Sequence, residues 1–148
     1  MNNINDNMLV QKCNNFGTAL ADGDYLPASA SFIDVSGLDR FAFVIGVGTL
    51  DTATTFAVFQ DTSATATGSI KAITGASQVV AATDDNKWLT IEVTAANIDQ
   101  DNSFRYVTLK ASGPAGSNDF ACVFFLGWNP RKAPVTQPSD YAYAVEVI

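Results

Sequence analysis

Histidine is absent from this chain of 148 residues. It is the commonest general base of enzymes and the commonest metal ligand of proteins, so its absence removes every Ser-His-Asp and Cys-His arrangement. The chain also lacks a Gly-x-Ser-x-Gly elbow, a Walker loop and a Gly-x-Gly-x-x-Gly fingerprint. The sequence therefore predicts a protein that is not an enzyme and that binds no cofactor.

Cysteine is scarce, with two residues that lie far apart in the sequence, Cys13 and Cys122. They can form a disulfide only if the fold brings their Cα atoms within about 7 Å. Cys122 lies inside an apolar run, which favours a buried thiol that stays reduced.

Charged residues make up 16% of the chain, and the net charge is −7. A surface of this sign is a poor partner for a phosphate backbone or an anionic bilayer, so we expect neither nucleic acid nor membrane as a partner. Among the fifteen acidic residues, only two are Glu. Asp favours turns and caps, so the acidic residues indicate loops between strands and few long helices.

Long apolar runs are missing too. The longest, Ala121 to Trp128, falls far short of the roughly 20 residues that a membrane helix needs. The first residues, Met-Asn-Asn-Ile-Asn-Asp, carry neither the positive charge nor the apolar core of a signal peptide, so we expect synthesis in the cytoplasm.

What the chain does contain is a series of alternating apolar segments, centred on residues 39–60. In the first half of this stretch Phe41, Phe43, Ile45 and Val47 recur at every second position, as on the buried face of a strand. A second apolar run, residues 54–60, follows a small polar segment with the Gly and Asp of a reversing loop. The pattern predicts a long β-hairpin at the centre of the domain.

Further strands are expected along the chain at a spacing of roughly ten residues, with turn signals between them. They cover residues 31–35, 69–73, 78–82, 87–94, 104–111 and 120–128. About eight short strands predict an all-β fold, an antiparallel β-sandwich or jelly roll. Alternation predicts the core residues Phe43, Ile45, Leu89, Ile91, Val93, Val107, Leu109 and Phe124.

Composition divides the chain into an amino-terminal arm (1–29), a β-sandwich domain (30–128) and a Pro-rich carboxyl-terminal arm (129–148). Prolines 130, 134 and 138 exclude a regular helix or a central strand from the last part, which ends in a predicted strand.

This carboxyl-terminal arm holds the candidate partner-binding residues. Tyr141 and Tyr143 lie on one face of the predicted terminal strand, which suits addition to the edge of a neighbour's sheet or completion of the protein's own sheet. Arg131 and Lys132 form an adjacent basic pair in an acidic chain, suited to acidic groups of a partner or simply to solvent.

Two further patterns have weaker functional interpretations. Asp99-x-Asp101-x-Ser103 has the spacing of a calcium loop but lacks its glycine and its distal Glu, so a solvated turn is favoured over a metal site. Trp88 and Trp128 have the chemistry to stack on sugar rings, although large aromatics are more often core or interface anchors, and we favour that role.

Five phrases of the sequence resemble small structural proteins of tailed bacteriophages. They are Asp34-Val-Ser-Gly-Leu-Asp-Arg-Phe, Thr54-Thr-Phe-Ala-Val, Thr83-Asp-Asp-Asn-Lys, Phe104-Arg-Tyr-Val and Arg131-Lys-Ala-Pro-Val. The likeness spans about residues 30 to 137. We associate these phage proteins with capsid decoration, or cement, proteins of β-sandwich or jelly-roll type.

The resemblance implies a virion protein, made in the host cytoplasm, that binds the outer surface of the head and stabilises contacts between subunits of the major capsid protein. Because closed point groups are common and a capsid offers matching local axes, we also expect self-association as a homodimer or a homotrimer. A tail or head-to-tail connector component and a carbohydrate-binding β-sandwich module are the alternatives.

Overall fold

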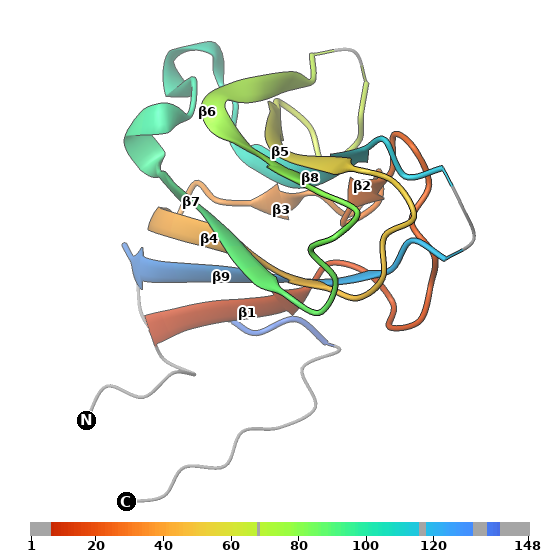
Figure 1. The fold of residues 1–148 in the computed structure, drawn as a ribbon. Helices are drawn as coiled ribbons and strands as arrows, with labels where there is room; N and C mark the ends of the chain where they lie inside the picture. The colour runs from red at the N-terminus through yellow and green to blue at the C-terminus, as the bar shows by residue number, and fades with distance from the viewer. Residues whose placement is uncertain (1–6, 68, 116–117, 132–135, 140–148) are drawn as a thin grey trace, which may run out of the picture.

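Two antiparallel sheets packed face to face make up the computed structural model, which describes residues 7–67, 69–115, 118–131 and 136–139 (Figure 1). Nine strands occur in this described part: β1 (Met8–Lys12), β2 (Tyr25–Leu26), β3 (Ile33–Asp34), β4 (Leu38–Val47), β5 (Thr54–Asp61), β6 (Lys71–Val80), β7 (Trp88–Thr94), β8 (Tyr106–Ser112) and β9 (Ala121–Pro130). The four-stranded sheet has the order β1-β9-β4-β7. The five-stranded sheet has the order β2-β8-β5-β6, with β3 also paired to β8. The predicted all-β antiparallel sandwich is confirmed.

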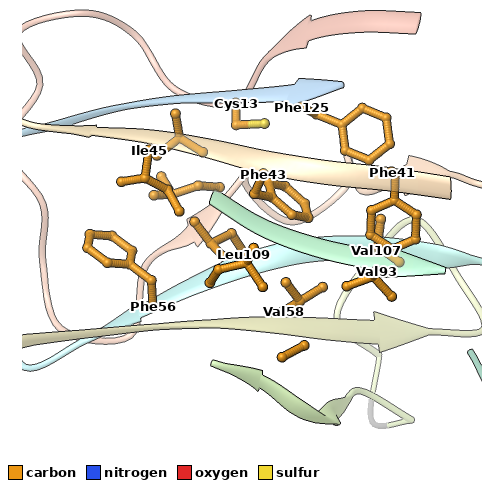
Figure 2. Packing of buried hydrophobic residues seen from close by; sticks show 14 of the residues in the cluster. Cys13, Phe41, Phe43, Ile45, Phe56, Val58, Val93, Val107, Leu109 and Phe125 are labelled. Carbon is orange, nitrogen blue, oxygen red and sulfur yellow. The ribbon is translucent and has the colours of Figure 1, made fainter. Parts of the chain in front are cut away.

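Side chains from the facing sides of the two sheets fill the core. Phe43 and Ile45 of β4 are fully buried, and Val58 and Leu109 meet them from the other sheet (Figure 2). The alternation that predicts strand β4 is thus the alternation between core and outer surface. Six of the predicted core residues are confirmed as buried, namely Phe43, Ile45, Ile91, Val93, Val107 and Leu109. Leu89 is partly buried and packs against the core.

Phe124 is not a core residue, and the prediction for it is wrong. Val123 and Phe125 are fully buried, while Phe124 points to the outer side of the sheet. Residues 120–128 are apolar at consecutive positions, so their sequence does not fix which alternate set faces inward. The pairing with β4 decides it, because Phe43 lies opposite Phe125 and shares its face.

The long hairpin predicted for residues 39–60 is also wrong. Strands β4 and β5 both form, but β4 pairs with β7 and β9, whereas β5 pairs with β6 and β8. The connecting residues 48–53 cross from one sheet to the other. Both strands have one strongly apolar face, and these two faces meet across the core instead of lying side by side.

The two short strands predicted on either side of Thr74-Gly75-Ala76 are a single strand, β6. Its pairing with β5 is interrupted: Ala57 lies opposite Ser77, whereas Phe59 lies opposite Ala72. The extra residues form a bulge in which Gly75 has a φ of +80°, a conformation that glycine adopts without strain. The glycine that suggested a turn therefore produces an irregularity within one strand.

Residues 8–26 of the predicted amino-terminal arm form part of the sandwich. Strand β1 pairs with β9 over its whole length, and β2 pairs with β8. Between these strands Cys13 and Leu20 are buried in the core. The arm was expected from its Asn, Asp and Gly content, which here belongs to loops that return the chain from one sheet to the other.

Two short 3-10 helices, Ala95–Asn97 and Gln100–Asn102, lie between β7 and β8. Asn97 Oδ1 accepts hydrogen bonds from the Thr94 backbone N–H at 3.2 Å and from the Thr94 hydroxyl at 2.7 Å. Thr94 is thus the N-cap of the first of these helices. No helix in the described part of the chain is long and apolar enough to cross a membrane.

Adjacent phenylalanines on β9 provide a direct test of the strand register. Phe125→Ala should lower the free energy of unfolding by about 3–5 kcal/mol, because it leaves a cavity between the sheets. Phe124→Ala should cost about 1 kcal/mol or less, because its ring lies on the outer side. Urea unfolding of both variants measures the difference, and equal losses would contradict the register.

Candidate interaction surface

The outer side of the four-stranded sheet is largely apolar. Cross-strand partners in an antiparallel sheet share a face, so the pairings place Val10, Leu126 and Ala42 in one row across β1, β9 and β4. The outer apolar face, as we call it, consists of Met8, Val10, Ala42, Val44, Trp88, Cys122, Phe124, Leu126 and Trp128. It lies opposite the buried face, so β9 over residues 121–126 and β4 over residues 41–45 are apolar on both sides.

Polar groups on this side lie towards its borders. Thr90 and Glu92 are exposed on strand β7, and the Arg40 guanidinium lies 3.2 Å from the Glu92 carboxylate. Both side chains are about half exposed, so this ion pair stabilises the fold by no more than about 1 kcal/mol. Lys12, at the end of β1, is the other basic residue on this side.

Two exposed aromatic residues stand at one corner of the outer apolar face. Trp88 is 69% exposed and Phe16 is 65% exposed. A Cβ atom on Gly46 would lie 3.1 Å from two ring atoms of Trp88, so the indole rests directly against the glycine backbone. The Phe16 ring lies 5.8 Å from that of Phe124. Between them is a hollow of about 370 Å³, the corner pocket, lined also by Phe120 and Cys122.

The sequence favours two roles for the tryptophans, as core residues or as interface anchors. The first role is wrong for Trp88, which is not a core residue. It lies on the outer side with Thr90 and Glu92, as the alternation of β7 predicts, and Trp128 is half-buried on the same side. Their other favoured role, as interface anchors, agrees with this position.

Cys122 forms no disulfide with Cys13, which is buried among the core residues. Burial raises the pKa of the Cys122 thiol, which keeps it protonated at neutral pH. The half-buried thiol is therefore a small apolar contributor to the floor of the corner pocket.

Strand β1 is the outer edge of this sheet, and Gln137 caps part of that edge. The Val10 backbone N–H donates a hydrogen bond to Gln137 Oε1 at 3.0 Å, and Gln137 Nε2 donates one to the Met8 carbonyl at 2.5 Å. The side-chain amide thus occupies the positions that the backbone of a neighbouring strand would take. Residues 136–139 run alongside β1 (Figure 1).

Arg131 lies in a second hollow, of about 300 Å³, at the end of the sandwich where β4 begins and β9 ends. Val35, Ile98 and Phe104 provide its apolar lining, and Arg105 lies beside Arg131. Of the four candidate partner-binding residues, Arg131 is placed here, whereas Lys132, Tyr141 and Tyr143 lie outside the described residues.

Each arginine of this hollow has a carboxylate partner. Arg105 donates hydrogen bonds from Nε, at 3.1 Å, and from Nη2 to Asp34 Oδ2. Arg131 Nε lies 3.4 Å from Asp39 Oδ1. Burial alone would raise the pKa of Asp34, but the hydrogen bonds from Arg105 and Ser36 outweigh it and hold that pKa below its ordinary value.

Asp99, from the calcium-like spacing, already has a cationic partner. Its carboxylate accepts hydrogen bonds from the Lys71 ammonium and, at 2.9 Å, from Asn102 Nδ2. These bonds, the one from Lys71 foremost, lower the pKa of Asp99. Across the described ranges no three His, Cys, Asp or Glu side chains are grouped as ligands of a metal ion.

Carboxylates at the opposite end of the sandwich fix loops. Asp119 is fully buried and accepts the backbone N–H of Asp51 at 2.5 Å and that of Ala115 at 2.9 Å. Asp85 accepts the Leu50 N–H at 3.0 Å, and Asp84 accepts the Ala81 N–H at 3.1 Å. These carboxylates lie in loops between strands, as the excess of Asp over Glu predicts, and they hold those loops by accepting backbone N–H groups.

Sequence reasoning missed the outer apolar face as a site. Its signal was present, because residues 120–128 are apolar at both alternate sets of positions. A strand that is apolar on both faces is typical of the middle of a sheet, or of a strand with a neighbour against each face. The central position is correct, since β9 lies between β1 and β4, but no layer of described residues covers its outer side.

No protein-family model matches this chain, and no curated protein matches its sequence. Among solved structures, the coat protein of Tobacco streak virus is similar, with a TM-score of 0.47 and 9% sequence identity. The similarity covers 97% of each chain. A likeness of this size transfers neither a fold nor a function, so the fold assignment comes from the strand pairings of this chain.

The Asp34–Arg105 pair should make stability depend on pH. Because the folded-state pKa of Asp34 is lowered, its contribution is present above the unfolded-state pKa and is lost as the pH falls through the folded-state value. Asp34→Asn should therefore lower the free energy of unfolding at pH 7, by no more than about 1 kcal/mol for so exposed a pair.

The difference between wild type and Asp34→Asn seen at pH 7 should shrink at a second, acid pH, as the pH falls below the unfolded-state pKa and through the lowered folded-state pKa of Asp34. Chemical unfolding at the two pH values measures it. A difference of equal size at both would show that the charge of Asp34 contributes nothing.

Proposed function

We propose that the protein is a structural virion protein of a tailed bacteriophage, bound in many copies to the outer surface of the head. There it would act as a decoration, or cement, protein that stabilises contacts between subunits of the major capsid protein. The five phrases between residues 34 and 135 that resemble small phage virion proteins support the phage and the capsid.

The outer apolar face is the observation that carries a contact function. A row of four non-polar side chains, Cys122, Phe124, Leu126 and Trp128, runs along the outer side of the central strand β9. These four side chains are half-buried, and Trp88 on the same face is 69% exposed. Burial of apolar surface stabilises a complex by roughly 25 cal/mol per Å², so a partner that covered this face would be bound. The surface suits another protein better than a small substrate.

We assign the partner contacts to the carboxyl-terminal arm, residues 129–148. Arg131 and Lys132 would meet acidic groups of the major capsid protein, beside the apolar lining of the hollow that contains Arg131. Tyr141 and Tyr143 would contribute to contacts between copies, in a homodimer or a homotrimer. A position at one vertex of the particle, instead of many sites over the head, would assign the protein to the tail or the connector.

Capsid stabilisation predicts a difference between decorated particles and particles from which the protein has been stripped. A protein that binds the assembled shell shifts its stability by mass action, so stripped particles should release their genome at a lower temperature. Adding the purified protein back should restore the original release temperature. Equal release temperatures for stripped and decorated particles would exclude a cement function.

A carbohydrate-binding module is the second candidate, favoured by the exposure of Trp88. An indole that is 69% exposed beside a hollow is the platform on which the apolar side of a sugar ring stacks. Binding to a glycan array should then be lost on Trp88→Ala and kept on Val79→Ala, which removes an exposed apolar side chain from the other sheet. Failure of the wild-type protein to bind any glycan would exclude this candidate.

A further inference from the structure

The outer apolar face is too small to hold two copies together by simple face-to-face packing. Four strands at about 4.8 Å spacing, and about seven residues at 3.3 Å each, give roughly 400 Å². A stable interface buries about 800 Å² on each partner. A second contribution of similar size is therefore needed before this face can join two copies.

The carboxyl-terminal residues 140–148 have the composition to supply it. In an extended conformation Tyr141, Tyr143, Val145 and Val147 share one face, while the intervening residues are Ala142, Ala144 and Glu146. Nine residues span about 30 Å, more than the roughly 19 Å width of four strands. The segment is thus long enough to lie across the whole outer apolar face.

The edge of β1 is not the place for this segment. Gln137 already bonds to the Met8 carbonyl and the Val10 N–H, which an added strand would need for its own main-chain bonds. The same two bonds fix residue 137 at the border of the sheet. The residues that follow therefore start beside the outer apolar face. The surface that we expect them to contact is this face and not the edge of β1.

Charge is complementary as well. Residues 140–148 contain two acidic residues, Asp140 and Glu146, and no basic residue. The outer side of the four-stranded sheet has Lys12 and Arg40 on its rows, with Glu92 as the one acidic residue among the paired positions of β4, β7 and β9. An acidic, apolar strand fits this surface better than a basic one.

We propose that residues 140–148 of one copy lie across the outer apolar face of a second copy, and that the exchange is reciprocal. A tyrosine of the segment enters the corner pocket between Phe16 and Trp88. Two exchanged segments plus the contact between the faces bring the buried area into the range of a stable dimer. Pro138 restricts the backbone before the segment, which lowers the entropy cost of ordering it.

The inference rests on the proposed function in one respect, namely that the protein works as an assembly of copies. Its test uses no capsid. Both tryptophans of the chain, Trp88 and Trp128, belong to the outer apolar face, so their fluorescence reports directly whether that face is covered. Light scattering after size-exclusion chromatography reports the number of copies. The two readouts together locate the segment.

The decisive variant is Tyr143→Asp in the full-length chain, with Ala142→Asp as its matched control. Tyr143→Asp should raise the dimer dissociation constant at least about tenfold, as expected for an aromatic anchor. It should also shift the tryptophan emission to longer wavelength and increase its quenching by acrylamide. Ala142→Asp carries the same charge on the opposite side of the strand and should leave the dimer and the emission unchanged, as should Tyr143→Phe.

Three outcomes would overturn the proposal. A wild-type chain that is monomeric at all concentrations, with a red shift in Tyr143→Asp, would place the segment on its own face. Unchanged emission and unchanged mass in Tyr143→Asp would remove the segment from this surface. Equal dissociation by Ala142→Asp and Tyr143→Asp would exclude a strand that contacts the face with one side. In each case the proposed function would still stand if the protein raised the temperature at which particles release their genome.

Discussion

Packing of three phenylalanines between the sheets is the interaction on which the rest of this fold depends. Phe41 and Phe125 stack with ring centroids 5.5 Å apart, and Phe43 meets Phe125 edge-on at 5.4 Å. These rings come from β4 and β9, the two central strands of the four-stranded sheet, and all three are buried. Side chains alternate between the two faces of a strand, so the inward position of these rings places Ala42, Val44, Phe124 and Leu126 on the outer side. The apolar outer surface therefore follows directly from a core built on strands that are apolar at every position over residues 41–45 of β4 and 121–126 of β9.

Much of the fold was predictable because strand alternation is a local property. The strands at 38–47, 54–61, 88–94 and 106–112 follow from it, as do the buried positions Ile91 and Leu109. Pairing is not local, which is why the hairpin at 39–60 was wrongly predicted: a six-residue connection fits a hairpin or a crossing between sheets equally well. The split of β6 was wrong for a related reason, since a glycine in the left-handed region occurs both in turns and in bulges.

The candidate site was less accessible from the sequence than the fold. Alternation correctly put Trp88 on the same side as Thr90 and Glu92, but its exposure depends on Gly46 of a strand forty residues away. The closure of the β1 edge by Gln137 joins residues more than 120 positions apart through a side-chain amide, for which no sequence pattern exists. The acidic residues, by contrast, were correctly related to turns, because an Asp that accepts nearby backbone N–H groups is a local feature.

The proposed function requires that the outer apolar face is covered in the assembled particle. Hydroxyl-radical labelling of intact particles, normalised for each residue to the rate in the unfolded chain, tests it most directly. Trp88 and Phe16 should be labelled several times more slowly than their exposures of 69% and 65% in the isolated chain imply, whereas Val79, 58% exposed on the other sheet, should be labelled as that exposure implies. Labelling of Trp88 and Phe16 at the rate expected from their exposure would contradict the claim.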